Sequence, residues 1–185
     1  MKNTLKTDRL VVRLFRHRDA GDLYDYLSLP ETYRFESGEP VSRRKAAEIA
    51  REFASGTNFW AAELVDGHKV VGHVSLFPAG PDRVQTWEIG YIFNPAYQRK
   101  GYATEAARAI IGYAFTKLDA HRVVAHCSPV NVASWKVLEK CGLRREGLEK
   151  KNIFFHHDAA GNPVWFDSYA YAILAEEFFA EGGQP

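Results

Sequence analysis

The chain has few cysteines, little net charge and no long apolar run. Its 185 residues include two cysteines, Cys127 and Cys141. Two cysteines are too few for a disulfide scaffold and are typical of a reducing cytoplasm, where we expect the protein to be located. The N-terminal segment lacks the apolar core of a signal peptide, and no apolar stretch approaches the roughly 20 residues of a membrane span. The sequence therefore predicts no membrane attachment.

The charges nearly cancel, and the histidines do not cluster in the sequence. Lysine and arginine together number 24 and aspartate and glutamate 23, so the formal net charge is +1. A near-neutral chain has no global basic field, which argues against direct nucleic-acid binding. His156 and His157 are adjacent in an expected strand and point to opposite faces, and His126 and Cys127 have the same arrangement. We therefore expect no metal site.

What is present predicts one domain over residues 1–180, with a disordered tail at 181–185. Hydrophobic residues make up 46% of the chain, an ordinary fraction for a soluble globular protein. Apolar periodicity predicts the element order β-α-α-β-β-β-α-β-α-β-β. The expected strands are Arg9–Phe15, Asn58–Val65, His68–Phe77, Gln85–Phe93, Arg122–Cys127, Leu143–His157 and Val164–Leu174. Two expected helices begin at the capping residues Asp19 and Ser42, and two more span 103–118 and 131–140.

The most informative stretch is the loop Gln98–Thr104, between an expected strand and an expected helix. The first N–H groups of a helix have no partner within it, and the helix dipole adds positive potential there. Arg99 and Lys100 add formal charge, and Gly101 permits a close approach of the backbone to a ligand. We therefore expect a ligand that carries phosphate groups. The alternative is an ordinary strand-to-helix turn, which also commonly contains glycine.

Two motifs resemble a known family. The loop reads Gln/Arg-x-x-Gly-x-Ala, which resembles the pyrophosphate loop of the GNAT acyl-CoA N-acetyltransferases. About thirty residues later, Asn-Val-Ala-Ser at 131–134 and Glu-Lys-Cys-Gly-Leu at 139–143 are similar to the second half of the GNAT cofactor site. With Arg-Glu-Gly at 145–147, the resemblance narrows to the RimJ/RimL-like branch, the ribosomal-protein serine/alanine N-acetyltransferases. It extends from Thr7 to about Leu174.

The resemblance implies a mixed α/β fold, the GNAT acyl-CoA N-acyltransferase fold. Its central sheet is mixed and mostly antiparallel, with helices on both faces. Two neighbouring parallel strands splay apart at a bulge, here 87–93 and 122–127, and the unpaired backbone receives the amide-bearing arm of acetyl-CoA. The residues thereby assigned to acetyl-CoA are Ile92, Phe93, Gln98, Arg99, Lys100, Gly101, Tyr102, Ala103, Thr104, Asn131 and Ser134. Lys140 is a candidate for the adenosine 3′-phosphate, although a solvated lysine at a helix end would look the same.

The implied reaction is acetyl transfer from acetyl-CoA to a primary amine by direct attack in a ternary complex. A protonated amine cannot attack, so a base or a water chain must remove a proton. Glu88 corresponds to the glutamate base of several GNAT branches, and its alternative role is a cross-strand ion pair. Ser134 corresponds to the serine that RimL-like members use to protonate or hydrogen-bond the departing sulfur. Its alternative role is the third residue of a helix capped by Asn131.

Two positions depart from the family pattern. Leu138 stands where many GNAT enzymes have a tyrosine acid, and Ile153 stands where RimL members have a glutamate base. These departures leave Glu88, the nearby Glu149 or water as the base. They also leave open a different class of function, a non-catalytic acyl-CoA-binding module.

The acceptor that the resemblance implies first is the α-amine of a protein or peptide N-terminus. The alternative is a small-molecule amine such as an amino acid, a polyamine or an antibiotic. We expect a groove for a peptide terminus between the loop 30–41 and the last hairpin. Tyr33, Phe35, Trp165 and Phe166 either line that groove or belong to the core. Related enzymes are often dimers, which leaves a homodimer open.

Overall fold

The computed structural model describes residues 4–180 and 182. Its centre is an eight-stranded sheet with the strand order β1-β2-β3-β4-β5-β6-β8-β7. The strands are β1 (Thr4–Lys6), β2 (Leu10–Leu14), β3 (Phe59–Leu64), β4 (Val70–Pro78), β5 (Thr86–Phe93), β6 (Arg122–Cys127), β7 (Arg144–His157) and β8 (Pro163–Leu174). Among these described strands β5 and β6 alone pair in parallel, and the other pairs are antiparallel. The expected mixed, mostly antiparallel sheet is therefore confirmed.

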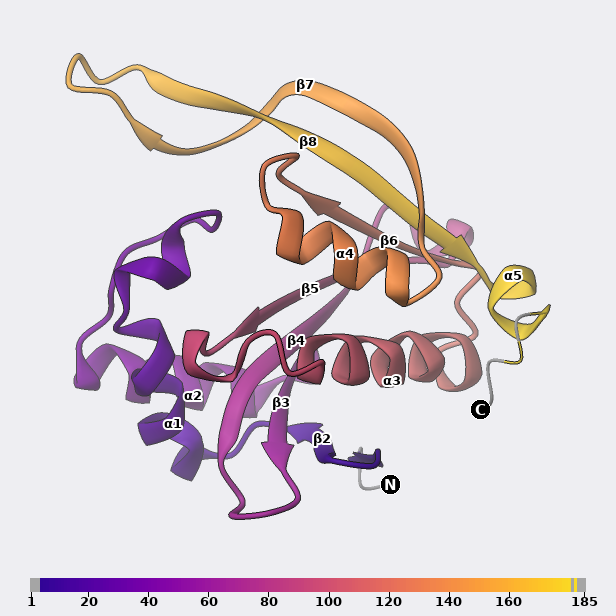
Figure 1. Cartoon of the computed structure of the whole chain (residues 1–185), viewed down its shortest axis with the longest axis horizontal. Coiled ribbons are helices and arrows are strands. Elements are labelled where there is room, and N and C mark those ends of the chain that lie inside the picture. The colour runs from indigo at the N-terminus through magenta and orange to yellow at the C-terminus, as the bar shows by residue number, and fades with distance from the viewer. Residues whose placement is uncertain (1–3, 181, 183–185) are drawn as a thin grey trace.

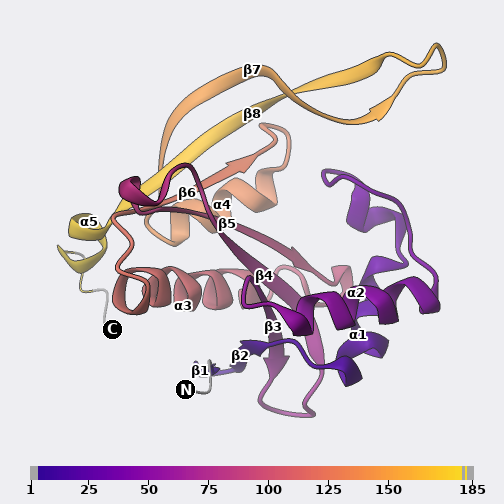
Figure 2. The same ribbon diagram turned by 180° about the vertical axis from the view of Figure 1, so that it is seen from behind.

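Helices cover both faces of the sheet, as the two opposite views of Figures 1 and 2 show. They are α1 (Ala20–Leu27), α2 (Arg43–Ser55), α3 (Tyr102–Lys117), α4 (Val132–Lys140) and α5 (Ala175–Ala180). The larger core cluster joins α3 and α4 to one face through residues such as Ile110 and Leu138. A smaller cluster joins α1 and α2 to the other face through residues such as Leu23 and Ala50. Burial of apolar side chains on both faces thus stabilises a three-layer domain.

The predicted element order is confirmed, with two additions at the ends. β1 pairs with β2 in front of the predicted order, and α5 follows the last strand. Ser42 caps α2 as predicted, because its hydroxyl accepts the Lys45 N–H. Asp19 does not cap α1 with its side chain; its carboxylate instead binds the guanidinium of Arg13. The predicted tail at 181–185 lies, apart from residue 182, outside the described residues.

The parallel pair β5–β6 is short, and this is the feature that creates the site. Pairing runs from Thr86–Arg122 to Glu88–Val124 and then stops, although β5 continues to Phe93. On its other side β5 remains paired with β4 along its length, and no register shift interrupts these described strands. The splay is therefore present as expected, but the β4–β5 ladder has no bulge.

The hairpin β7–β8 projects well beyond the rest of the sheet, above the segment between α1 and α2 in the view of Figure 1. Register shifts interrupt it between Glu149 and Ile153 and again further along. Exposed apolar side chains occur along it, including Leu148, Phe154 and Trp165. No helix within the described part of the chain is long and apolar enough to cross a membrane.

Candidate active site

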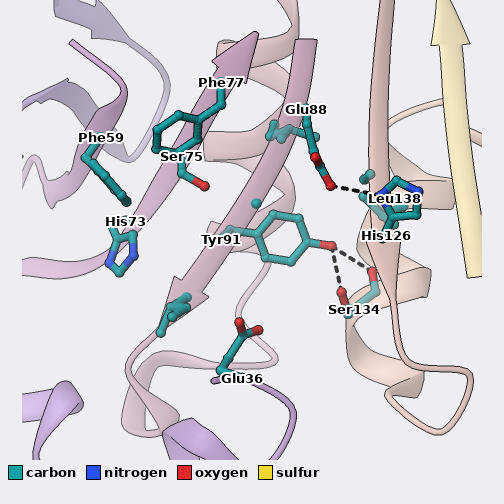
Figure 3. Close-up of a pocket in the computed structure, with 14 residues that line it drawn as sticks. Glu36, Phe59, His73, Ser75, Phe77, Glu88, Tyr91, His126, Ser134 and Leu138 are labelled. Carbon is teal, nitrogen blue, oxygen red and sulfur yellow. Dashed lines mark hydrogen bonds and ion pairs between the residues drawn. The ribbon is translucent and has the colours of Figure 1, made fainter. Parts of the chain in front are cut away.

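A cavity of about 420 Å³ lies where β5 and β6 diverge (Figure 3). Side chains from both faces of the sheet line it, so it passes through the sheet. Glu36 reaches it from the segment between α1 and α2, and Phe59 and Phe77 from β3 and β4. β6 contributes His126, and α4 contributes Ser134. The opening therefore connects the α1/α2 face of the sheet with the α3/α4 face.

The free edge of β5 presents main-chain groups at alternate residues. The Asn94 N–H donates to the Val71 carbonyl, so the even-numbered residues of β5 direct their main-chain groups to β4. Tyr91 and Phe93 consequently face the open side. The main-chain groups of Ile92 face β4, so Ile92 lacks the open main-chain groups that were expected for it, and the neighbouring Tyr91 has them. An unpaired strand edge of this kind suits an amide-bearing ligand.

The loop Gln98–Thr104 leads into the N-terminus of α3 through two residues with positive φ angles. Gly101, which precedes the first residue of α3, has φ +85°, and Arg99 has φ +61°. The Gln98 side chain closes the loop as expected, because its amide donates to the Phe93 carbonyl at 3.0 Å. The Phe93 carbonyl therefore already accepts one hydrogen bond at the open edge of β5. Lys100 is exposed at the loop and lies over the Tyr97 ring.

Residues before β2 hold this loop in place. The Arg9 guanidinium donates to the Lys100 carbonyl at 2.9 Å and bonds to the Glu105 carboxylate in the first turn of α3. The Thr7 hydroxyl donates to the same carboxylate at 2.6 Å. Burial opposes ionisation of Glu105, but the bonds from Thr7 and Arg9 outweigh it and hold its pKa below the ordinary value. The start of the chain thus fixes the N-terminus of α3.

On the α1/α2 face, Glu88 and His126 form a pair. Their neighbours Ile89 and Ala125 are in the core on the α3 face, so these two side chains lie on the opposite one. Glu88 Oε1 is 2.8 Å from His126 Nδ1, and Glu149 Oε1 on β7 is 3.8 Å from His126 Nε2. The hydrogen bond to Glu88 raises the pKa of His126 above its ordinary value, against the opposing effect of burial.

Two further titratable groups line the cavity. His73 is fully buried among aromatic rings, its Nδ1 is 2.8 Å from the Tyr26 hydroxyl, and burial lowers its pKa to about 4. His73 is therefore neutral at pH 7 and a weak base. Burial raises the pKa of Glu36 to about 7, which makes that carboxyl group a second candidate for proton transfer.

On the α3/α4 face, Ser134 lies in the first turn of α4, and its N–H is bound by the side chain of Asn131. Asn131 therefore caps α4, and Ser134 is the third residue of that helix, as its alternative role supposes. The Tyr91 hydroxyl donates to the Ser134 carbonyl at 2.9 Å and lies 3.1 Å from Ser134 Oγ (Figure 3). The phenol of Tyr91, on β5, thus approaches Ser134. The position at which many GNAT enzymes have a tyrosine acid is here Leu138, a buried core residue.

The two cysteines are buried, and three aromatic residues of the expected groove contact neighbouring parts of the protein. Burial raises the pKa of Cys127 to about 11 and that of Cys141 to about 12, so neither thiol is a nucleophile at neutral pH. The Tyr33 hydroxyl donates to the carbonyl of Leu27, the last residue of α1. Trp165 and Phe166 pack against other aromatic rings of the hairpin. Among residues 4–180 and 182, no three His, Cys, Asp or Glu side chains are placed to hold a metal ion.

The geometry agrees with three comparisons with known proteins. The acetyltransferase (GNAT) domain family matches residues 9–144. This chain belongs to the GNAT acetyltransferase family. It is 36% identical over 175 residues to the uncharacterized N-acetyltransferase YnaD of Bacillus subtilis, covering 94% of this chain and 98% of that protein. The crystal structure of a GNAT acetyltransferase from Bacillus anthracis has a TM-score of 0.84 and 34% identity, covering 94% of this chain and 99% of that one.

A more distant relative has a named substrate. The [ribosomal protein uS5]-alanine N-acetyltransferase of Escherichia coli is 31% identical over 159 residues, which cover 80% of this GNAT chain and 82% of that protein. GNAT acetyltransferases use acetyl-CoA, and the free β5 edge and the N-terminus of α3 fit its pantetheine arm and its pyrophosphate.

The sequence motifs gave no role at the candidate site to four residues that line the cavity, Glu36, His73, Tyr91 and His126. His126 was weighed as a metal ligand, although its place on a strand expected to run parallel to that of Glu88 could have indicated the pair. Tyr91 gave no signal, because the residue that it approaches is on α4, more than forty positions later.

Proposed function

We propose that this acetyltransferase acetylates the N-terminal α-amine of a protein or peptide, as the RimJ/RimL-type enzymes that it resembles do. The cavity through the sheet is the observation on which the proposal rests. It has a carboxylate–imidazole pair on the α1/α2 face and a hydroxyl on the α3/α4 face. An amine can therefore approach from one face and a thioester from the other.

In the proposed mechanism, groups on the α1/α2 side of the cavity activate the amine, and groups at the β5 edge and on α4 stabilise the charge that develops on the thioester. Acetyl-CoA supplies a thioester whose acetyl carbon the amine attacks. The Glu88–His126 pair removes a proton from the ammonium ion, because only the neutral amine is a nucleophile. The Tyr91 N–H, on the free edge of β5, donates to the oxygen of the attacked carbonyl group. The Ser134 hydroxyl donates a hydrogen bond to the departing sulfur.

The acceptor is proposed from the similarity to the uS5-alanine enzyme together with the shape of the site. Glu36 brings the loop between α1 and α2 to the cavity, and the hairpin β7–β8 projects above this loop (Figure 2). We propose that these two segments hold the chain that follows the acceptor amine, which a peptide has and a small amine lacks.

An acceptor panel tests this proposal. Thiol release from acetyl-CoA would be measured with peptides beginning with Ala, Ser or Met, with the same peptides blocked at the N-terminus, and with amino acids, polyamines and aminoglycosides. We expect release with free peptides and none with blocked ones. Release with small amines alone would reassign the enzyme to metabolite or drug modification. Binding of acetyl-CoA without release from any acceptor would favour a non-catalytic module.

Loss of the Ser134 hydroxyl is expected to lower kcat about 10- to 160-fold with little change in the KM for acetyl-CoA. The range follows from a hydrogen bond to a charged group, worth about 1.5–3 kcal/mol, at 1.36 kcal/mol per tenfold in rate. Single-turnover kinetics of Ser134→Ala would measure it. Tyr91→Phe should slow the same step, and the double variant should lose less than the product of the two effects, because the hydroxyls are in contact. Tyr113→Phe, whose ring packs on Trp60, is the control. Independent effects would show that Tyr91 does not act with Ser134.

A further inference from the structure

Three titratable side chains from three strands form a row beside the cavity. Glu88 is on β5, His126 on β6 and Glu149 on β7, and His126 lies between the two carboxylates. The side chains are 46%, 38% and 45% exposed, respectively, so an incoming amine can reach them. The row brings together residues as far apart in sequence as Glu88 and Glu149, and the sheet makes them neighbours.

We propose that His126 Nε2 is the base that takes the proton from the acceptor ammonium ion, and that Glu88 is a positioning residue for His126. This inference rests on the proposed acetyl transfer to an amine. It differs from the expectation from the sequence, in which the Glu88 carboxylate itself is the base.

The hydrogen bond between Glu88 and Nδ1 decides which nitrogen of His126 is basic. An ionised carboxylate only accepts hydrogen bonds, so Nδ1 carries the proton of the neutral ring and the lone pair is on Nε2. At 3.8 Å, Glu149 Oε1 is too far from Nε2 for a direct hydrogen bond, which leaves Nε2 free for the amine or for a water molecule. Once Nε2 is protonated, carboxylates on both sides of the ring stabilise the imidazolium ion.

The other charged groups near His126 do not change this assignment. Ala170, the β8 residue paired with His126, has no titratable side chain. Arg122, on the same strand, is paired with Glu146. Glu36 and His73 also line the cavity and are therefore the rivals for the base. Of these two, His73 is neutral and weakly basic, which leaves Glu36 as the group to test.

The step balances as follows. The ammonium ion gives one proton to His126 Nε2, and the neutral amine forms a C–N bond to the acetyl carbon as the C–S bond breaks. The nitrogen loses a second proton to the thiolate, which leaves as a thiol. His126 then releases its proton to water beside Glu149. The products are the N-acetyl amine, the free thiol of coenzyme A and one proton.

The test is the pH profile of kcat for the wild type, His126→Gln, Glu88→Gln and Glu36→Gln, with His121→Gln as an exposed control. With His126 as the base, the wild-type rate rises with pH through a pKa above 6.5, because Glu88 raises the pKa of His126. His126→Gln should lower kcat roughly 10²- to 10⁴-fold and abolish this rise of kcat with pH, the acidic limb of the profile. Glu88→Gln should keep the limb but move it to lower pH. The amine of the acceptor also titrates. Repeating the profiles with acceptors that differ in amine pKa would identify any limb that shifts with the acceptor and therefore reports ionisation of the amine.

Other outcomes would reject the assignment. Loss of the limb in Glu88→Gln, with the limb intact in His126→Gln, would make Glu88 the base. Loss in Glu36→Gln alone would make Glu36 the base. An NMR titration of His126 in wild type and Glu88→Gln measures the pair without turnover, and equal pKa values would refute the positioning role. No thiol release from wild type with any acceptor would reject the proposed function itself, whereas normal release by His126→Gln would reject only this inference.

Discussion

Replacing Arg13 by alanine is expected to lower the free energy of unfolding by about 3–5 kcal/mol. The Arg13 guanidinium is 3% exposed and bonds to Asp19 at 2.7 and 2.8 Å and to Glu63, also at 2.7 Å. Its removal leaves two carboxylates buried without their cation, which is costly because desolvation is no longer offset. Chemical denaturation at pH 7 would measure the loss, with the exposed Arg18→Ala as a matched control.

A second variant separates charge from packing at this site. In Arg13→Met with Asp19→Asn and Glu63→Gln, no uncompensated charge remains, so we expect a smaller loss than in Arg13→Met alone. Equal losses would assign the effect to packing.

The pH dependence of the Arg13 effect has a definite sign. Burial opposes ionisation of Glu63, but its bonds to Arg13 outweigh burial and hold its pKa below the ordinary value of 4.5. The pair therefore stabilises the folded state above pH 4.5, and this contribution is lost as the pH falls through the lowered pKa. The difference between wild type and Arg13→Ala should accordingly shrink in acid. A difference that stays constant from pH 7 to pH 3 would contradict the ionic origin.

Gly72→Ala is expected to destabilise the fold by about 1–3 kcal/mol or more and to raise the KM for acetyl-CoA. A Cβ at position 72 would lie 2.6 Å from the Phe93 ring and 2.7 Å from the Ile92 carbonyl oxygen. The ring could rotate away, but the carbonyl belongs to the β5 backbone, so the end of β5 must move. That end accepts the Gln98 bond that closes the phosphate loop, which links this packing defect to cofactor binding.

Gly21→Ala is the matched control. Position 21 lies in α1, and no atom lies within 4 Å of the added Cβ. The change should stabilise the helix by about 0.5–1 kcal/mol and leave the KM unchanged. Thermal unfolding and steady-state kinetics on both variants would test the pair. A Gly72→Ala enzyme with wild-type KM and stability would show that the end of β5 is not rigidly coupled to the loop.

The sequence by itself determined the elements and the position of the loop Gln98–Thr104 before α3, because these depend on local patterns. The short apolar strand Arg122–Cys127 and the helical spacing that buries Ile110 and Ala114 are local patterns, and the structure agrees with both. The loop Gln98–Thr104 was found from its charges, its glycine and its position before a helix. The Ser42 cap was read correctly because its partner, Lys45, is three residues away.

Only the tertiary structure decided what depends on contacts between distant segments. Asp19 has the pattern of a helix cap, yet the buried guanidinium of Arg13 binds its carboxylate, since an ionic partner in the core outweighs a single backbone bond. His126 has no distinguishing neighbours in sequence, and it gains its role because β6 lies beside β5 and near β7. Tyr91 approaches Ser134 across the gap between β5 and α4. Short-range patterns form elements, whereas the positions of these side chains depend on strand order and on the point where two strands diverge.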